Sequence, residues 1–191
     1  MKKRIFVAVD LSEEIQLKVA QYIEELRQAF SNLKVGWERK EKLHLTLKFL
    51  GEIELKKVKW LEKVVSDVAR DFTPFTIEIS GTGFFGSKSY PRVLWLGVSD
   101  NSGCLERLQK ILDLECQKVG FKSENRDFKA HLTIGRIRQP ELASELLQEH
   151  LRRGFLGGEF QVSEVVIYES QLLREGSRYS IVSKHKLNQS F

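Results

Sequence analysis

The chain has 191 residues, of which 41% are hydrophobic, and a formal net charge of +5. This composition excludes a low-complexity or disulfide-framework protein and allows a globular domain with a real core, while the positive charge favours phosphate-bearing partners. The apolar run after the basic start ends at Asp10, too short for a signal peptide, and no later segment is long enough to span a membrane, so we expect a cytoplasmic protein.

The first half of the chain is predicted to alternate strands with amphipathic helices. Residues 4–9 form the first expected strand, and Ser12 followed by two glutamates marks the start of a helix that ends near Phe30. Apolar side chains recur along this helix at three- and four-residue steps, as on a helix packed against a sheet. Further along follow a short strand at 35–38, a strand at 43–51 and a helix at 55–72.

The second half repeats this order of elements. Strands at 75–81 and 92–99 flank an expected loop at 83–91, which is rich in glycine, serine and aromatic residues. Later elements are a helix at 103–119, a strand from residue 130, a helix from Pro140 to Arg153, and strands at 160–169 and 178–187. The expected fold class is therefore α+β, a single domain over residues 1–191 with two pseudo-symmetric lobes, each an antiparallel sheet flanked by helices.

Two of the expected strands carry the same pattern, a histidine followed two residues later by a threonine. The segments read HLTL from His44 and HLTI from His131, in a chain with only 4 histidines. Alternate side chains of a strand share a face, so His44 and Thr46 would lie about 6.6 to 6.8 Å apart on one face, and His131 and Thr133 likewise. The intervening leucines then face the core. We expect the two motif strands to line a central cleft.

Two histidines across a cleft suit in-line displacement at phosphorus. A neutral imidazole accepts the proton of the nucleophile, and an imidazolium protonates the leaving oxygen. The threonine hydroxyls are suited to donate hydrogen bonds to nonbridging phosphate oxygens. The residues alone leave open which histidine is the acid. Because the cysteines and histidines lack metal-ligand spacing, we expect neither a metal nor another cofactor.

Other residues near the motifs have less specific signals. Phe49 either continues the apolar face of its strand into the core or stacks on a base. His150 and His185 lack the threonine partner and are expected at the surface. Basic residues flank both motifs, namely Arg39, Lys40, Lys42 and Lys48 near the first and Arg126, Lys129, Arg136 and Arg138 near the second.

The two motifs and several shorter segments resemble a known family. HLTLKFLG at 44–51 and HLTIGR at 131–136 resemble the paired H-x-T-x motifs of the two-histidine (2H) phosphoesterases. RIFVA from Arg4, PRVLW from Pro91 and ESQL from Glu169 are similar to the branch of RNA 2′,3′-cyclic phosphodiesterases, also called 2′-5′ RNA ligases. Taken together, these segments extend over nearly the whole chain.

The resemblance implies metal-independent hydrolysis of RNA 2′,3′-cyclic phosphate termini to 2′-phosphate ends, with possible reverse 2′-5′ ligation. It implies that His44 is the proton donor and His131 the proton acceptor. Thr46, Thr133 and Arg136 would bind the phosphate. For Arg136 to share the face of His131, the strand needs a bulge at Gly135 or a twist at its end.

Two alternative functions stay open. One is a 2H phosphoesterase that acts on a small cyclic phosphate or a 2′-5′ oligonucleotide. The other is a non-catalytic module that binds RNA ends. The expected partners are RNA 3′ ends that bear a 2′,3′-cyclic phosphate, such as those of tRNA fragments, with no membrane partner and a monomeric protein.

Overall fold

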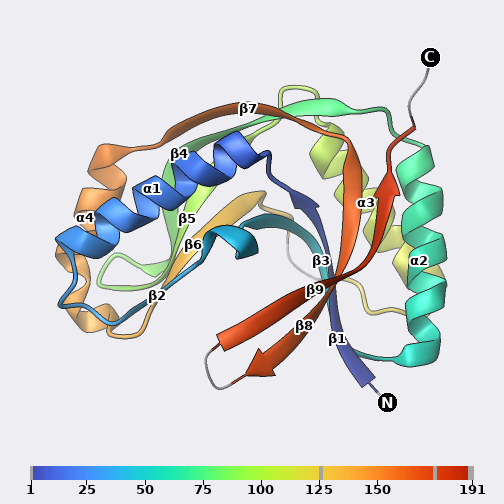
Figure 1. The fold of residues 1–191 in the computed structure, drawn as a ribbon, viewed down its shortest axis with the longest axis horizontal. Coiled ribbons are helices and arrows are strands. Elements are labelled where there is room, and N and C mark those ends of the chain that lie inside the picture. The colour runs from blue at the N-terminus through green and yellow to red at the C-terminus, as the bar shows by residue number, and fades with distance from the viewer. Residues whose placement is uncertain (1, 125–126, 174–175, 189–191) are drawn as a thin grey trace.

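A computed structural model describes residues 2–124, 127–173 and 176–188 of the chain (Figure 1). In these ranges the chain forms nine strands, four α-helices and two 3₁₀ helices. In chain order they are β1 (Lys2–Asp10), α1 (Glu13–Ala29), β2 (Val35–Trp37), η1 (Lys40–Lys42), β3 (His44–Glu54), α2 (Leu55–Arg70), β4 (Phe75–Ser87), β5 (Tyr90–Ser99), α3 (Cys104–Lys118), β6 (His131–Ile137), η2 (Pro140–Leu142), α4 (Ser144–Arg153), β7 (Leu156–Val162), β8 (Glu164–Leu173) and β9 (Gly176–Lys186).

The strands build two antiparallel sheets, which confirms the predicted two-lobed α+β class. One sheet has the order β3-β1-β8-β9 and the other the order β2-β6-β5-β4-β7. The lobes do not coincide with the halves of the sequence. Strand β2, from the first half of the sequence, belongs to the five-stranded sheet. The hairpin β8–β9, from the second half of the sequence, completes the four-stranded sheet.

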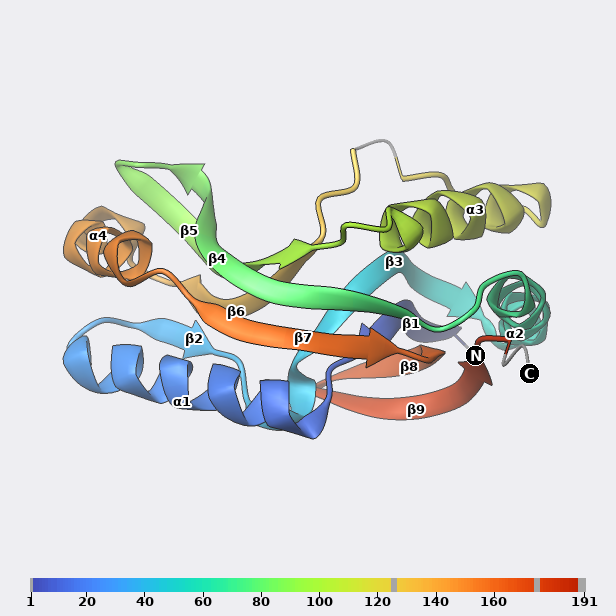
Figure 2. The ribbon, with the colours of Figure 1, turned by 90° about the horizontal axis from the view of Figure 1, so that it is seen from above.

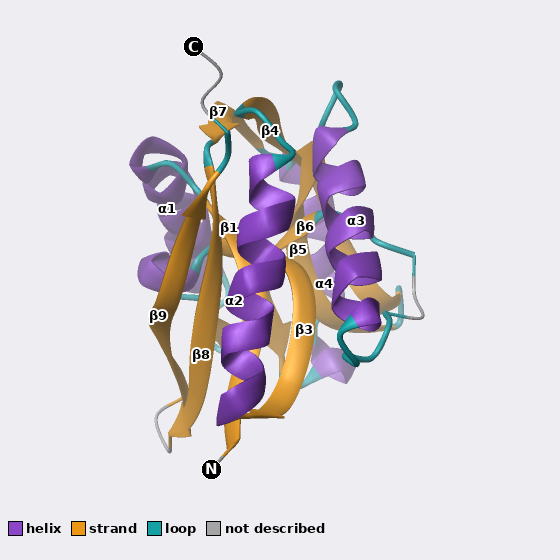
Figure 3. Ribbon diagram, turned by 90° about the vertical axis from the view of Figure 1, so that its right-hand side faces the viewer, coloured by secondary structure: helices purple, strands orange, loops and turns teal. Residues whose placement is uncertain are grey.

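The helices also cross between the lobes. Helices α2 and α3 lie together over the four-stranded sheet, whereas α1 and α4 pack on the five-stranded sheet (Figures 2 and 3). Helix α1 thus follows β1 of one sheet and covers the other, and α3 follows β5 and packs on β3. In the described residues, no helix combines the length and apolar content needed to cross a bilayer.

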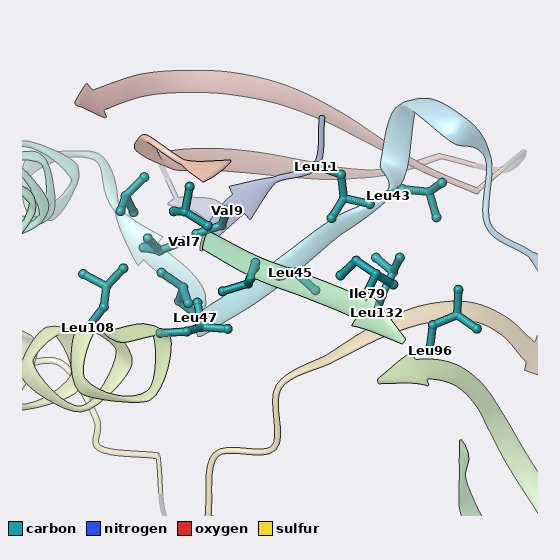
Figure 4. Close-up of a cluster of buried hydrophobic side chains, with 14 of the residues drawn as sticks. Val7, Val9, Leu11, Leu43, Leu45, Leu47, Ile79, Leu96, Leu108 and Leu132 are labelled. Carbon is teal, nitrogen blue, oxygen red and sulfur yellow. The ribbon is translucent and has the colours of Figure 1, made fainter. Parts of the chain in front are cut away.

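The apolar faces of the motif strands lie in the core, as predicted from alternation. Leu45 and Leu47 of β3 and Leu132 and Ile134 of β6 are each at most 3% exposed. Figure 4 shows Leu45, Leu47 and Leu132 within the cluster of buried side chains. The start of α1 is also confirmed, since the Ser12 hydroxyl accepts a hydrogen bond from the Ile15 amide at 3.3 Å.

The expected loop at 83–91 is wrong, because β4 and β5 form one long hairpin that turns at residues 88–89. Gly83 lies within β4, where its missing side chain makes room for the ring of Trp95. A Cβ built at Gly83 would come within 2.1 Å of that ring. The glycine is therefore a site of close packing, a role that composition does not separate from a turn.

The structure differs from two further predicted element boundaries. The strand expected at 160–169 is two strands, β7 and β8, which belong to different sheets and meet at Ser163. Only the polar pair Ser163-Glu164 stands between the two strands, and polar residues also alternate with apolar ones inside a single strand, so the sequence does not reveal this change of sheet. The helix expected from Pro140 begins with the 3₁₀ turn η2, and its α-helical part starts at Ser144.

The prediction of a surface position for His150 is wrong, because its side chain is fully buried. Its Nδ1 accepts a hydrogen bond from the Tyr22 hydroxyl at 2.9 Å, and its Nε2 donates to the carbonyls of Gly83 and Trp95 at 3.1 and 3.2 Å. The side chain of His150 therefore joins α4 to α1 and to the β4–β5 hairpin, and burial lowers the pKa of its imidazole. His185 is partly buried and lies 2.9 Å from the Ser183 hydroxyl through Nε2.

Candidate active site

The two motifs occupy equivalent positions in the two sheets. His44 is the first residue of β3 and His131 the first residue of β6, and these strands contact each other between the lobes. Along both strands the exposure of side chains follows the same order, with partly buried histidine and threonine separated by buried leucine. The predicted alternation of faces is thus present in both motifs, while the cleft between them stays a prediction.

Both motif strands contain a β-bulge at the fourth motif position. In β3, Thr46 pairs with Ala8 and Lys48 pairs with Val7, which leaves Leu47 as the extra residue. In the same way β6 has Ile134 as an extra residue between two paired neighbours. An extra residue reverses the alternation of faces beyond it.

The bulges decide where Phe49 and Arg136 point. Phe49 returns to the face of His44, where it is 62% exposed and its ring centroid lies 6.0 Å from that of Phe6. Lys48 takes the core position and is 3% exposed, so the core alternative for Phe49 is wrong and Lys48 does not belong to the basic set around the motif. Arg136 returns in the same way to the face of His131, through a bulge one residue before the predicted Gly135.

Aromatic rings surround His44. Its ring stacks on Phe6 with centroids 4.8 Å apart, and the rings of Tyr179 and Tyr168 lie at 5.4 and 5.9 Å. The Tyr168 hydroxyl donates to both carboxylate oxygens of Asp10, at 2.7 and 2.9 Å, which fixes this ring. Burial lowers the pKa of His44 to about 4, although a backbone hydrogen bond to Lys42 opposes this effect.

His131 has its own aromatic neighbours. The Phe85 ring meets it edge-on at 4.9 Å, and the Trp95 ring lies at 6.3 Å with the ammonium of Lys129 4.4 Å from its centroid. His131 Nδ1 donates to the carbonyl of Lys129 at 2.6 Å, so Nε2 is the nitrogen that is left for proton transfer. Burial lowers the pKa of His131, the hydrogen bond to the Lys129 carbonyl opposes this effect, and the charges of Lys129 and Arg136 lower the pKa further.

Charged groups link the two motifs. Arg136 Nε lies 3.9 Å from Oε1 of Glu38, the residue after β2. Burial raises the pKa of Tyr179, the Glu38 charge raises it further, and the Arg136 charge lowers it. The Arg136 charge thus lowers the pKa both of His131 and of Tyr179, whose ring lies against His44.

Several residues of this site escape sequence reasoning. Phe6, Phe85, Trp95 and Tyr168 come from strands without the motif and reach the histidines through strand pairing. Their signal in the sequence is an aromatic residue inside a strand, which equally indicates core. Within residues 2–124, 127–173 and 176–188, no three His, Cys, Asp or Glu side chains gather closely enough to hold a metal ion.

Comparison with protein families identifies a relationship along the whole chain. The model of the family described as LigT like Phosphoesterase matches twice, at residues 9–95 and 96–179. Each match contains one of the two motifs. An RNA 2′,3′-cyclic phosphodiesterase of Methanothermobacter thermautotrophicus is 38% identical over 98% of this chain and 100% of its own length. A protein of the same name from Archaeoglobus fulgidus is 37% identical over 92% of this chain and 96% of its own length.

Solved structures share the fold. The crystal structure of a Thermus thermophilus protein, TT0787, superposes with a TM-score of 0.84 at 24% identity, over 98% of this chain and 100% of that chain. The crystal structure of Escherichia coli LigT complexed with 3′-AMP has a TM-score of 0.75 at 26% identity, over 99% of this chain and 100% of that chain. The two-lobed arrangement of this chain is therefore that of these proteins.

Proposed function

Because the chain belongs to the LigT-like phosphoesterase family, we propose that it hydrolyses 2′,3′-cyclic phosphate termini of RNA and leaves 2′-phosphate ends. The names of the M. thermautotrophicus and A. fulgidus relatives support this substrate. The observation that carries the proposal is the matched pair of motif strands. Both have the same exposure pattern and the same bulge, and each histidine is hydrogen-bonded to the backbone two residues upstream.

In the proposed step, water attacks the phosphorus in line with the bond to the ribose O3′. The new P–O bond forms while the P–O3′ bond breaks, His131 accepts the proton of the water, and His44 gives a proton to O3′. The hydroxyls of Thr46 and Thr133 and the guanidinium of Arg136 bind the nonbridging oxygens and stabilise the charge that develops on them. Phe49 would stack on a base of the RNA, and its exposure on the same face supports this role.

The same site would support ligation. With the 5′-hydroxyl of a second RNA in place of water, the step forms a 2′-5′ linkage, and in the reverse cleavage the two histidines exchange roles. We further propose that the protein acts as a monomer in the cytoplasm on RNA 3′ ends such as those of tRNA fragments. The net charge of +5 supports a polyanionic partner.

The assignment of donor and acceptor comes from the family resemblance. Burial alone would favour His44 as the acceptor, because a pKa of about 4 leaves its imidazole neutral near pH 7. As the donor, His44 must gain its proton when the anionic phosphate enters, since a nearby negative charge raises the pKa of an imidazole.

The pH dependence of catalysis follows from these shifts. The pKa values of His44 and His131 are both lowered, so in the ligand-free enzyme the required imidazolium is lost as pH rises through values below 6.5. The plot of kcat/KM against pH is therefore expected to be a bell with its alkaline limb below pH 6.5, while the bound phosphate moves the bell for kcat to higher pH. A kcat/KM profile that rises to a plateau without an alkaline fall would contradict the pairing of the histidines.

An oligonucleotide with a 2′,3′-cyclic phosphate end tests the function directly. We expect conversion to a 2′-phosphate end, detected by mass spectrometry, at the same rate in excess EDTA, because the histidines supply the proton transfers. Loss of activity in EDTA with rescue by Mg²⁺, Mn²⁺ or Zn²⁺ would overturn the mechanism.

A second measurement distinguishes RNA from a small substrate. If the natural substrate is small, the salt dependence of kcat/KM will be no steeper for the oligonucleotide than for a cyclic mononucleotide.

Replacing Thr46 or Thr133 with alanine is expected to lower the rate roughly ten- to a hundredfold, or about 1.5 to 3 kcal/mol of transition-state stabilisation each. Thr→Ser variants keep the hydroxyl and should keep most of the activity. The melting temperature should change little, because the apolar packing lies on the opposite face, at Leu45 and Leu132. A melting temperature that collapses together with activity would mean that the threonines are structural.

A further inference from the structure

A carboxylate lies beside the proposed phosphate site and has no role in the chemistry described above. Glu38 follows β2, and its amide donates to the carbonyl of Ile134, the bulged residue of β6, at 2.9 Å. Its side chain is 20% exposed and reaches to 3.9 Å from Arg136 Nε. The bulge that turns Arg136 toward the site therefore also holds Glu38 next to it.

The Glu38 carboxylate acts on groups from both lobes. Burial raises its pKa, and the charges of Arg136 and Lys42 lower it. The Lys42 ammonium also lies 5.7 Å from the centroid of the Tyr179 ring, which contacts His44 and is itself affected by the Glu38 charge. A negative charge at Glu38 thus makes the electrostatic potential more negative near Arg136 and Tyr179, where the phosphate is expected.

Substrate and product of the proposed reaction differ in charge. The cyclic phosphodiester carries one negative charge, whereas the phosphomonoester carries close to two above its second pKa of about 6. Repulsion by a fixed carboxylate grows in proportion to the charge of the ligand. We propose that Glu38 discriminates against the phosphomonoester product, so that the product leaves the Arg136 site more readily than the cyclic substrate does. This inference rests on the proposed function, because it takes Arg136 as a phosphate ligand.

Glu38→Gln removes the charge and keeps the shape of the side chain. At pH 8, calorimetry with adenosine 2′-monophosphate should show Kd lowered on the order of tenfold, whereas KM for adenosine 2′,3′-cyclic phosphate, which carries one negative charge, should fall only roughly threefold. Stronger inhibition by product should accompany the change. Glu38→Asp keeps the charge and should keep the discrimination. Glu41→Gln removes one charge from the exposed neighbouring turn and should change both quantities less than twofold.

The outcomes separate this inference from the proposed function. If wild-type protein hydrolyses the cyclic nucleotide but Glu38→Gln tightens monoester and diester equally, the discrimination is wrong and the function stands. If Glu38→Gln weakens both ligands, Glu38 only holds Arg136 in place and the inference is overturned. If wild-type protein hydrolyses no cyclic phosphate, the function fails, and calorimetry with adenosine 2′-monophosphate and with inorganic phosphate still shows whether Glu38 repels a dianion.

Discussion

His44→Ala and His131→Ala are each expected to lower kcat by about 10² to 10⁴ on an RNA with a 2′,3′-cyclic phosphate end. Each substitution removes one of the two groups that transfer protons. The other residues of the motifs, which are leucine, threonine and isoleucine, cannot exchange a proton near neutral pH. His185→Ala is the matched control, because His185 is a partly exposed histidine bonded to Ser183 and should leave kcat within about twofold of wild type. Near-wild-type turnover in either motif variant would end the proposed mechanism.

The two histidine variants also separate donor from acceptor. An acyclic phosphodiester with a phenolate leaving group needs no proton on the departing oxygen, so a variant without the donor should lose far less activity on it. If His44 is the donor, His44→Ala is largely restored on this substrate and His131→Ala is not. The opposite pattern would reverse the roles. Because His44 stacks on Phe6, circular dichroism should accompany the assay to show that the variant is folded.

Short-range regularities made much of the site predictable. Alternation along a strand placed Leu45 and Leu132 in the core and put the histidines and threonines on the other face, and the cap at Ser12 located α1. These patterns depend on a few neighbouring residues, which the sequence displays directly. The repeated motif likewise indicates two related strands from the sequence alone.

Pairing between strands was not predictable in the same way. A bulge is a property of two strands in register, so the sequence of β3 alone did not show that Leu47 is the extra residue. That one residue exchanged the positions of Lys48 and Phe49. For Arg136 the family resemblance supplied the missing constraint, because a phosphate ligand had to share the face of His131.

Long-range partners explain the remaining errors. His150 is buried by contacts with Tyr22, which is 128 positions away in the chain, and with carbonyls of two other strands. The exchange of helices between lobes has the same origin, since an amphipathic pattern shows that a helix packs on a sheet but not on which sheet. Sequence patterns therefore predicted the faces of the motif strands better than the elements that pack around them.

Lys48, which the bulge turns inward, forms a buried ion pair. The Lys48 ammonium, on a side chain only 1% exposed, donates to the Asp113 carboxylate of α3 and, at 2.8 Å, to the carbonyl of Lys122. Burial would raise the pKa of Asp113, but the hydrogen bond from Lys48 and others from Glu124, Ser123 and Gln117 hold it below the usual value. The pair joins β3 to α3 and to the segment that leads toward β6.

Asp113→Ala is expected to lower the free energy of unfolding by about 3 to 5 kcal/mol, because it leaves the Lys48 ammonium buried without a counter-charge. Lys48→Met should cost less, since Asp113 is 12% exposed, keeps donors from Ser123 and Gln117, and Met fills the space of the lysine stem. Urea denaturation at pH 7 measures the loss for both variants.

The stability that the Lys48–Asp113 pair contributes should be present above the ordinary pKa of an aspartate and be lost as pH falls through the lowered pKa of Asp113. Asp67→Ala, which breaks exposed pairs with Lys63 and Arg70, is the control and should lower the free energy of unfolding far less. Equal losses for Asp113→Ala and Asp67→Ala would show that the buried charge is compensated elsewhere. A loss confined to Asp113→Ala would mean that the bulge after the motif, besides exposing Phe49, buries the charge of Lys48, which α3 must then neutralise.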